Sequence, residues 1–263
     1  MTNTTKNQIH ATAIVADSAI IHEDVSIGAY TIIGPHVEIK SGTKIGNHAC
    51  IEGYTTIGHN NVISNFTAIG GAPQDKKYNN EDTRLEIGDN NTIREFCTIH
   101  TGTSNGGGLT KIGDNNWIMA YVHIAHDCIV GNNIIFANNA TLAGHVLVKD
   151  WAILAGHALV HQFCVVGEHS MIAGNSGIIK DLPPYIMAFG HSAEPKGVNT
   201  EGLKRRSFTQ EQIDNIKNAY KILYRSGLSY TDAKACITEL AETQPELLVF
   251  VEFFNQSVRG VIR

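Results

Sequence analysis

The 263-residue sequence lacks the features that mark secreted and membrane proteins. Its five cysteines form no CxxC pair, which favours a reducing compartment over a disulfide framework. Its apolar runs, such as the one from Leu247 to Val251, are far too short to span a membrane. The first residues, MTNTTKNQ, are polar and resemble no secretory signal. We therefore expect a cytoplasmic protein without membrane insertion.

An excess of positive charge is also missing. The formal net charge is −5 and the isoelectric point is near 6.2, so we expect no nucleic-acid partner. The hydrophobic content of 43% is ordinary for a globular chain. The length allows one large domain and one small domain.

What the sequence has instead is a strict six-residue repeat. Aliphatic residues recur at this spacing from Ile9 to Ile69, from Ile87 to Ile99 and, with Phe136 as one exception, from Ile112 to Ile178. Such self-similarity marks a repeat architecture. A helix of period 3.6 cannot keep a period of six on one side, so short strands separated by turns are predicted.

Two further positions of the repeat are informative. Four residues after each aliphatic, the side chain is usually small or β-branched, as at Ala13 and Thr31, so that two positions per hexad suit the inside of a narrow prism. The residue directly after the aliphatic is often glycine, as at Gly28 and Gly113. We expect these glycines to turn the corners with unusual backbone angles.

This pattern resembles the hexapeptide-repeat proteins, whose fold is a left-handed parallel β-helix with three hexads in each triangular coil. The resemblance implies an all-β prism over residues 1–185. Two interruptions of the repeat, at 70–85 and 102–111, are expected to be loops that leave the prism and carry function. The glycines at 106–108 match no phosphate-binding loop, since no GK[ST] follows, and we interpret this stretch as a flexible loop.

After the repeat the pattern becomes helical. A connecting segment is expected over 186–206 and a small α-helical domain over 207–263. Thr209 and Gln212 have the spacing of a capping box at the start of the first helix. Further helices are predicted to begin at Thr231 and Pro245.

Four of the 13 histidines fall on one edge of the predicted prism. The register of the hexads stacks His126, His145 and His161 on successive coils, with His123 at the preceding corner. Histidine takes a proton from a hydroxyl near neutral pH, so this edge is a candidate catalytic site. Asp127, next to His126, is placed to hold an imidazole in the useful tautomer.

Other interpretations of this edge stay open at this point. A cluster of histidines can bind zinc, as in the gamma-type carbonic anhydrases that share the fold, although the short His123-x-x-His126 spacing does not reproduce their arrangement. A coenzyme A-dependent hexapeptide acetyltransferase and a scaffold without catalytic activity are further alternatives. Cys128 and Cys164 fall on the small inward position, which favours core filling over a nucleophilic role.

Several segments are specific enough to point to one family. They are Pro73-Gln74-Asp75, Gly107-Gly108-Leu109-Thr110-Lys111, His123-Ile124-Ala125-His126-Asp127-Cys128, Ala137 to His145, Val160-His161-Gln162-Phe163-Cys164 and Asn199 to Arg206. With them the chain resembles, over nearly its whole length, the UDP-N-acetylglucosamine O-acyltransferases that begin lipid A synthesis in Gram-negative bacteria.

The resemblance implies transfer of an (R)-3-hydroxyacyl chain from acyl carrier protein to the 3-hydroxyl of UDP-N-acetylglucosamine, without an acyl-enzyme. It implies a homotrimer with active sites between adjacent prisms. We expect neither a cofactor nor a metal ion. Lys204, Arg205 and Arg206 are expected to help dock the acidic carrier protein.

The resemblance also assigns roles to individual residues. His126 is the implied general base, Asp127 supports it, and the backbone amide of Gly144 donates to the oxyanion. Gly174 matches the position that limits acyl length, where the missing side chain favours a long chain. The implied substrate-binding residues are Gln74, Asp75, His123, His145, His161 and Gln162, with Asn199, Glu201, Arg205 and Arg206 as the nucleotide contacts.

Overall fold

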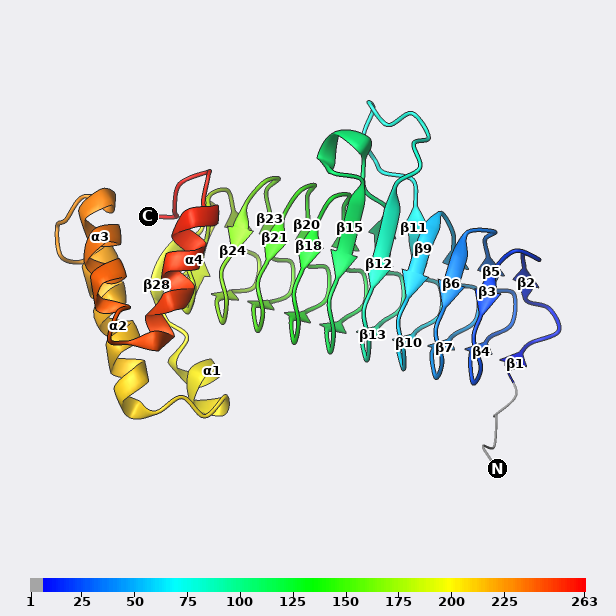
Figure 1. Ribbon diagram of the computed structural model, residues 1–263, viewed down its shortest axis with the longest axis horizontal. Helices are drawn as coiled ribbons and strands as arrows, with labels where there is room; N and C mark the ends of the chain where they lie inside the picture. Colours follow the sequence, from blue (N-terminus) through cyan, green and yellow to red (C-terminus); the bar gives the residue numbers. More distant parts are fainter. Residues whose placement is uncertain (1–6) are drawn as a thin grey trace.

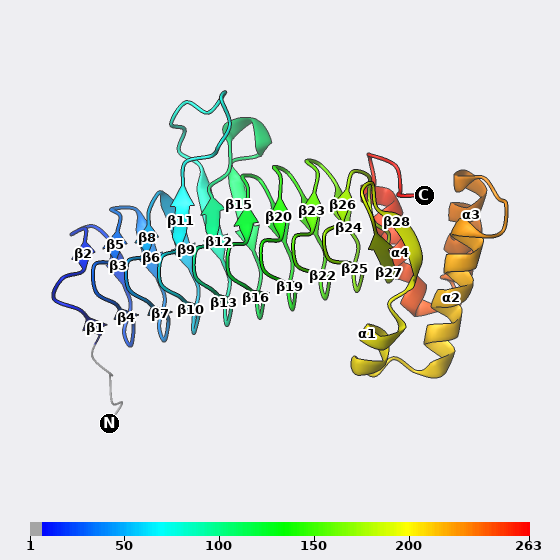
Figure 2. The same ribbon diagram turned by 180° about the vertical axis from the view of Figure 1, so that it is seen from behind.

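The computed structural model describes residues 7–263, and most of the polar N-terminal stretch MTNTTKNQ lies outside this part of the chain. Short parallel strands wind around a long prism, and helices gather at the end opposite to the N-terminus (Figures 1 and 2). The predicted parallel β-helix with a helical C-terminal region is therefore confirmed.

The strands form three sheets, which we name A, B and C. Sheet A contains β1 (Gln8–Ile9), β4 (Ser26–Ile27), β7 (Lys44–Ile45), β10 (Val62–Ile63), β13 (Thr92–Ile93), β16 (Trp117–Ile118), β19 (Ile135–Phe136), β22 (Ile153–Leu154), β25 (Met171–Ile172), β27 (Ile186–Phe189) and β28 (Glu194–Val198). Sheet B contains β2 (Ile14–Val15), β5 (Ile32–Ile33), β8 (Cys50–Ile51), β11 (Ala68–Gly71), β14 (Thr98–His100), β17 (His123–Ile124), β20 (Thr141–Leu142), β23 (Leu159–Val160) and β26 (Gly177–Ile178). Sheet C contains β3 (Ile20–Ile21), β6 (Val37–Ile39), β9 (Tyr54–Ile57), β12 (Arg84–Ile87), β15 (Leu109–Ile112), β18 (Ile129–Val130), β21 (Leu147–Val148) and β24 (Val165–Val166).

The three edges of the prism take their names from the sheets that they join. In each coil the chain turns from sheet B to sheet C at the BC edge, from C to A at the CA edge, and from A to B at the AB edge. Only the hairpin of β27 and β28 is antiparallel among the strand pairs of the described residues.

The hexad residues fill the prism as predicted. From Ile27 to Ile178 the repeated aliphatic or aromatic side chain is buried in every hexad. The small inward position is buried as well, and where it is polar it bonds to the next coil: the Thr31 hydroxyl donates to the carbonyl of Gly46 at 2.7 Å. The period of six is therefore the signature of two buried side chains per strand and turn.

The expected role of the repeat glycines is wrong. The left-handed backbone angles occur three residues after the aliphatic, at residues such as Asn60, Phe66 and Asp127, and not at Gly28 or Gly113. A Cβ on Gly28 would overlap the side chain of Asn47 in the next coil. These glycines are thus required because adjacent coils approach closely, and not for an unusual φ.

The three predicted C-terminal helices are present, and a further short helix lies in the segment 186–206, where none was predicted. In chain order, the helical elements after the prism are α1 (Thr200–Arg205), α2 (Gln210–Tyr224), α3 (Tyr230–Leu240), the 3₁₀ turn η2 (Pro245–Leu247) and α4 (Leu248–Gln256). Thr209 caps α2 with the predicted capping box, since its hydroxyl accepts from the amide of Gln212 and the Gln212 side chain accepts from the amide of Thr209.

The helices share a continuous apolar core with the prism. The hydroxyl of the buried Tyr185, at the end of the prism, donates to the carbonyl of Glu246 at 2.8 Å. The segment 186–206 holds β27, β28 and α1, and its division from the prism and the helical domain stays a prediction. No helix among residues 7–263 has both the length and the apolar character that crossing a membrane requires.

Candidate active site

The candidate site lies on the BC edge. The turn between β17 and β18 carries His126 and Asp127, and the turn of the next coil carries Gly144 and His145. The amide of His145 donates to the carbonyl of His126 at 3.0 Å, so the predicted stacking of these residues on successive coils is confirmed. Both loops leave the prism at this same edge, between β11 and β12 and between β14 and β15 (Figures 1 and 2).

His126 and Asp127 form a hydrogen-bonded pair. Nδ1 of His126 lies 2.7 Å from Oδ2 of Asp127. The two residues are adjacent in sequence, and Asp127 has a left-handed φ of 60°. An ionised carboxylate only accepts hydrogen bonds, so Nδ1 carries the proton and Nε2 of His126 is left as a base.

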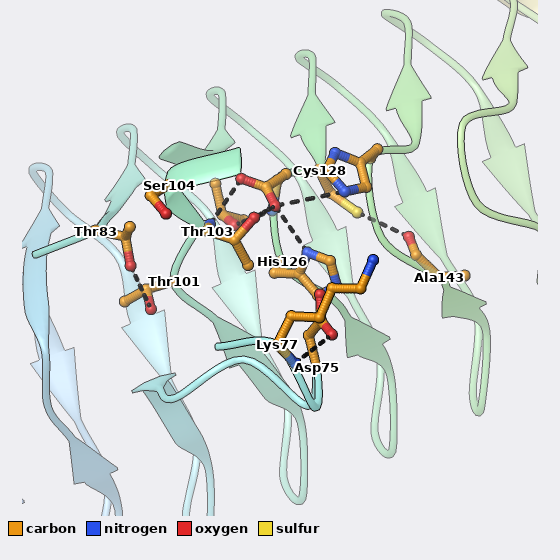
Figure 3. Close-up of polar contacts among 12 residues, drawn as sticks. Asp75, Lys77, Thr83, Thr101, Thr103, Ser104, His126, Cys128 and Ala143 are labelled. Atoms are coloured by element: carbon orange, nitrogen blue, oxygen red, sulfur yellow. Dashed lines mark hydrogen bonds and ion pairs between the residues drawn. The ribbon is translucent and has the colours of Figure 1, made fainter. Parts of the chain in front are cut away.

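The second loop covers the carboxylate of this pair. The amide of Thr103 donates to Oδ1 of Asp127 at 2.8 Å, and the Thr103 hydroxyl donates to Oδ2 at 2.7 Å (Figure 3). The hydroxyl of Thr110 accepts from the amide of Asp127. The stretch around the glycines at 106–108 was interpreted from sequence as flexible. It instead contains a short 3₁₀ turn, η1 (Ser104–Gly106), which packs on the dyad of His126 and Asp127.

His145 stands beside the pair. Its ring is edge-on to His126, with ring centroids 5.1 Å apart, and is stacked on Phe163 at 4.4 Å. Its Nε2 lies 3.7 Å from Oδ2 of Asp127. Burial lowers the pKa of His145, and the charge of His126 lowers it further. The carboxylates of Asp127 and Asp75 act in the opposite direction without reversing the shift. His145 is therefore neutral at neutral pH.

A hollow of about 760 Å³ opens at this edge. It brings together five of the predicted site residues from four separate stretches of the sequence. It is lined by Gln74, Asp75, Lys76, Lys77, Thr103, Asn105, Gly106, His126, His145, Gln162 and Phe163. The first loop supplies Gln74 to Lys77, and the amide of Lys77 fixes the Asp75 carboxylate at 2.9 Å (Figure 3). A small polar ligand thus meets a base, carboxamides and charges of both signs.

His123 and His161 do not line this hollow. His123 lies on the outer face of sheet B, where its Nδ1 is 2.7 Å from the Thr98 hydroxyl. His161 is exposed, and its Nδ1 meets only the carbonyl of Gln162 at 3.2 Å in the described chain. The edge that was predicted to carry four imidazoles therefore offers two of them to the hollow.

His100, the neighbour of His123 on sheet B, was not predicted from the sequence. Its ring is edge-on to that of His123, with centroids 5.0 Å apart. Burial lowers the pKa of His100 to about 4, and the charges of His123 and His126 act in the same direction. Burial and the charge of His126 also lower the pKa of His123. His100 could have been found from the register of the sheet, because Thr98 pairs with His123 and His100 lies two residues further along the same strand.

The two predicted glycines lie on different edges. A Cβ on Gly144 would lie 2.6 Å from Cε1 of His126, so this turn touches the imidazole directly. The amide of Gly144 donates to no other protein group within residues 7–263. Gly174 lies at the AB edge, where a Cβ would meet only the carbonyl of Gly156 at 3.4 Å.

The four predicted nucleotide contacts lie near the CA edge and not at the hollow. The Asn199 side chain caps α1 and donates to the carbonyl of His169 at 3.0 Å. The guanidinium of Arg206 lies over the ring of Trp151, 5.1 Å from its centroid, and donates to the Trp151 carbonyl. Glu201 and Arg205 are exposed on α1. Within one chain, therefore, the structure does not join these residues to His126.

His126, Asp127 and His145 also form a group that could hold a metal ion, since one ligand atom from each lies within 4.8 Å of the others. An ion on Nδ1 of His126 would replace the hydrogen bond to Asp127. The carboxylate oxygens already accept from Thr103 and His126. Of the candidate ligand atoms, Nδ1 of His126 and the Asp127 carboxylate are thus already engaged in hydrogen bonds within the described chain, whereas Nε2 of His126 is not.

Comparison with known proteins found relatives that are similar to this chain over nearly its whole length. The family described as "Udp N-acetylglucosamine O-acyltransferase; Domain 2" matches residues 181–262, and "Bacterial transferase hexapeptide (six repeats)" matches 18–53 and 109–144. The chain is 56% identical to the acyl-[acyl-carrier-protein]--UDP-N-acetylglucosamine O-acyltransferase of Neisseria gonorrhoeae, over 97% of this chain and 99% of that one. It is 51% identical to the protein of the same name from Paraburkholderia phymatum, over 98% and 100% of the two chains.

The fold is similar to solved structures of the same kind. The structure of LpxA from Acinetobacter baumannii superposes with a TM-score of 0.95 at 46% identity, over 97% of this chain and 99% of that chain. The UDP-N-acetylglucosamine O-acyltransferase (LpxA) of Moraxella catarrhalis gives a TM-score of 0.94 at 43% identity, over 97% and 99%.

Proposed function

Because the chain belongs to the UDP-N-acetylglucosamine O-acyltransferase family, we propose that the hollow on its BC edge is the site of acyl transfer and that His126 is the general base. The protein is an acyltransferase that moves an acyl chain from acyl carrier protein to UDP-N-acetylglucosamine, the first step of lipid A biosynthesis. The relatives do not favour the zinc hydratase, coenzyme A or scaffold alternatives.

The observation that carries the catalytic proposal is the His126–Asp127 pair. With Nδ1 bonded to the carboxylate, Nε2 can take the proton of the sugar 3-hydroxyl. The sugar oxygen then attacks the carbonyl carbon of the (R)-3-hydroxyacyl thioester. The imidazolium that forms is stabilised by Asp127, whose side chain is only 1% exposed. When the carbon–sulfur bond breaks, the proton passes from Nε2 to the departing thiolate.

The developing oxyanion needs a hydrogen-bond donor near the base. The amide of Gly144 is the proposed donor, because it has no partner in the described chain and its residue touches the His126 ring. The neutral imidazole of His145, together with Asp75, Gln74 and Gln162, then positions the sugar and the acyl chain by hydrogen bonds. A neutral His145 adds no repulsion to the imidazolium.

Substrate contacts by α1 require a second chain. Glu201 and Arg205 lie near the CA edge of their own prism, away from the hollow on the BC edge. We propose a homotrimer in which one chain supplies His126 and its neighbour supplies the nucleotide contacts. Three further points remain predictions: that Gly174 limits acyl length, that His123 and His161 contact the acyl chain, and that the protein is cytoplasmic.

Docking of the carrier protein is proposed for the exposed basic residues of α1. Lys204 and Arg205 are exposed, whereas Arg206 is held against Trp151. An acidic carrier protein would meet the first two by electrostatic attraction. Of the predicted basic run, Arg206 is therefore the least suited to this contact.

The experiment that tests the base measures thioester consumption from 3-hydroxymyristoyl acyl carrier protein with UDP-N-acetylglucosamine. For His126→Ala we expect a loss of at least about 10²-fold in kcat with the fold retained. The control is His59→Ala, which removes an exposed turn histidine far from the hollow. Turnover of His126→Ala at the wild-type rate would remove His126 from the mechanism.

The shared site is tested by mixing two inactive variants. His126→Ala and Arg205→Ala chains, unfolded together and refolded, should regain part of the activity, because mixed trimers contain one site with both wild-type residues. Refolding each variant by itself is the control. If the mixture stays as inactive as its components, the site is complete within one chain and the proposed arrangement is wrong.

A further inference from the structure

We propose that Thr103, on the second loop, is a positioning residue for acyl transfer: it holds the Asp127 carboxylate in the orientation in which that group also binds Nδ1 of His126. The inference rests on the proposed role of the His126–Asp127 pair. It assigns a function to the loop at 102–111, which the hexad repeat left unexplained.

The contacts of Thr103 reach both oxygens of one carboxylate. Its amide donates to Oδ1 of Asp127 and its hydroxyl to Oδ2, at 2.8 and 2.7 Å. The same Oδ2 accepts from Nδ1 of His126 at 2.7 Å. Rotation of the carboxylate about its last bond would break all three contacts at once. Hydrogen bonds to an ionised group are about twice as strong as neutral ones, so this orientation is well defined.

The hydroxyl of Thr103 does not make the capping hydrogen bond that its position in the turn favours. Thr103 is the N-cap of η1, and a threonine in that position usually caps its own helix with its side-chain oxygen. Here the side chain makes no capping hydrogen bond and turns to Asp127, 24 residues away. The amides of Gly106 and Gly108 close the turn onto the Thr103 carbonyl instead. The turn is therefore built around the carboxylate.

The backbone of the loop also seals the carboxylate from water. A Cβ on Gly106 would overlap Cγ and both oxygens of Asp127, and a Cβ on Gly102 would lie 2.9 Å from Oδ1. Only a chain without side chains at these two positions can lie so close. Gly106, one of the three glycines that match no phosphate-binding loop, is thus required by its close contact with the Asp127 carboxylate.

Further hydrogen bonds fix the neighbour of Thr103 and the backbone of Asp127. The neighbouring Ser104 donates from its hydroxyl to Oε1 of Glu81 on the first loop, at 3.1 Å. Behind the loop, Thr110 binds the amide of Asp127 at 2.8 Å. The first loop also carries Asp75 into the hollow, so the two loops form one connected support for the dyad.

The Thr103 donors also bear on the charge that His126 experiences. Two donors on the carboxylate draw off part of its negative charge, which otherwise favours the protonated imidazole. The other ionisable groups that face the pair are His100, His123, His145, Asp75, Lys76 and Lys77. Without the hydroxyl, more of that negative charge acts on the imidazolium that forms when Nε2 takes the proton. The acidic limb of the pH–rate profile should then move to higher pH.

The test compares Thr103→Val, which keeps the shape of the side chain and removes the hydroxyl, with Thr103→Ser, which keeps the hydroxyl. On the full-length enzyme with acyl carrier protein thioester, we expect Val to lower kcat about 10-fold or more, with little change in KM for UDP-N-acetylglucosamine. The acidic limb of its profile should shift upward. Ser should stay within about threefold of wild type, with an unmoved limb.

A merely structural role gives a different result. Val would then lower the melting temperature while kcat per folded enzyme and the acidic limb stayed at their wild-type values, and the inference would be overturned. If Val does not fold, Thr103→Ala removes the same hydroxyl with less bulk and is read against Ser in the same way. Failure of the proposed function is separate, because it appears as an active His126→Ala whatever Thr103 does.

Discussion

The hydroxyl of Ser257 donates to the carboxylate of Asp181 at 2.7 Å, although 76 residues separate them. Asp181 ends the last coil of the prism, and Ser257 directly follows α4. The same carboxylate accepts from the amides of Val165 and Arg259, at 2.8 and 3.0 Å. One fully buried charge therefore ties the end of the helical region to the prism.

Replacing Asp181 with alanine should destabilise the protein by about 3 kcal/mol or more, because three hydrogen bonds to a buried carboxylate are lost and the buried amide of Val165 is left without its acceptor. The change is measured as the free energy of unfolding in urea. Asp214→Ala is the matched control, since this exposed carboxylate on α2 should change the value by less than about 0.5 kcal/mol. Equal effects of the two substitutions would contradict the role of Asp181.

Asp127→Asn should lower kcat by at least about 10²-fold. One end of an asparagine side chain is a donor, and it would face either Thr103 or His126, which are both donors here. Asparagine tolerates the left-handed φ at this turn, so the fold should persist. Asp24→Asn is the control, because Asp24 has nearly the same φ of 59° and is exposed. A small loss for both variants would count against the dyad.

Gly144→Ala should impair catalysis more than folding. The added methyl would lie 2.6 Å from Cε1 and 2.8 Å from Nε2 of His126, so the ring must move. We expect kcat to fall at least about 10-fold, since catalysis is sensitive to displacements of about 1 Å. Gly156→Ala, whose Cβ would be an ordinary 3.5 Å from the nearest atom, should leave the melting temperature and kcat close to wild type.

The stability of the protein should fall in mild acid because of His100. The unfolded chain protonates this imidazole near its ordinary pKa of 6.5, whereas burial keeps the folded form neutral down to about pH 4. The stabilisation is therefore complete above about pH 6.5 and is lost as the pH falls toward 4. Between pH 7 and 5 this amounts to about 2 kcal/mol.

The measurement for His100 is the free energy of unfolding at pH 7 and pH 5 for wild type and His100→Leu. The variant should lose about that much less stability between the two pH values, whatever its absolute stability. His123 contributes in the same direction and is present in both proteins. An unchanged difference in the variant would mean that His100 is not the group responsible.

Much of the fold could be predicted because the repeat counts residues around the prism. Once the period of six is known, the residues that share an edge follow, which is why His126 and His145 were correctly stacked. The role of the repeat glycines was predicted wrongly, because the sequence shows that a residue is small but not which contact requires it to be small. At Gly28 the reason is a neighbouring coil, which is 18 residues away in sequence.

The unpredicted parts of the site depend on contacts outside the repeat. Thr103 reaches Asp127 only because the second loop folds back on its own edge, and no periodicity encodes that. His161 shares the predicted edge, but its side chain faces solvent. The position of α1 near the CA edge likewise depends on the packing of Arg206 on Trp151, a contact between residues 55 apart.

The two loops leave and rejoin the prism without disturbing it. On sheet C, Arg84 pairs with Tyr54 before it and with Leu109 after it, so strands on either side of each excursion stay in register. The number of residues in each loop therefore does not change how the strands of successive coils pair. Insertions and deletions at the BC edge can accumulate over evolutionary time without a cost to folding, and substrate preference can diverge there while the scaffold stays the same.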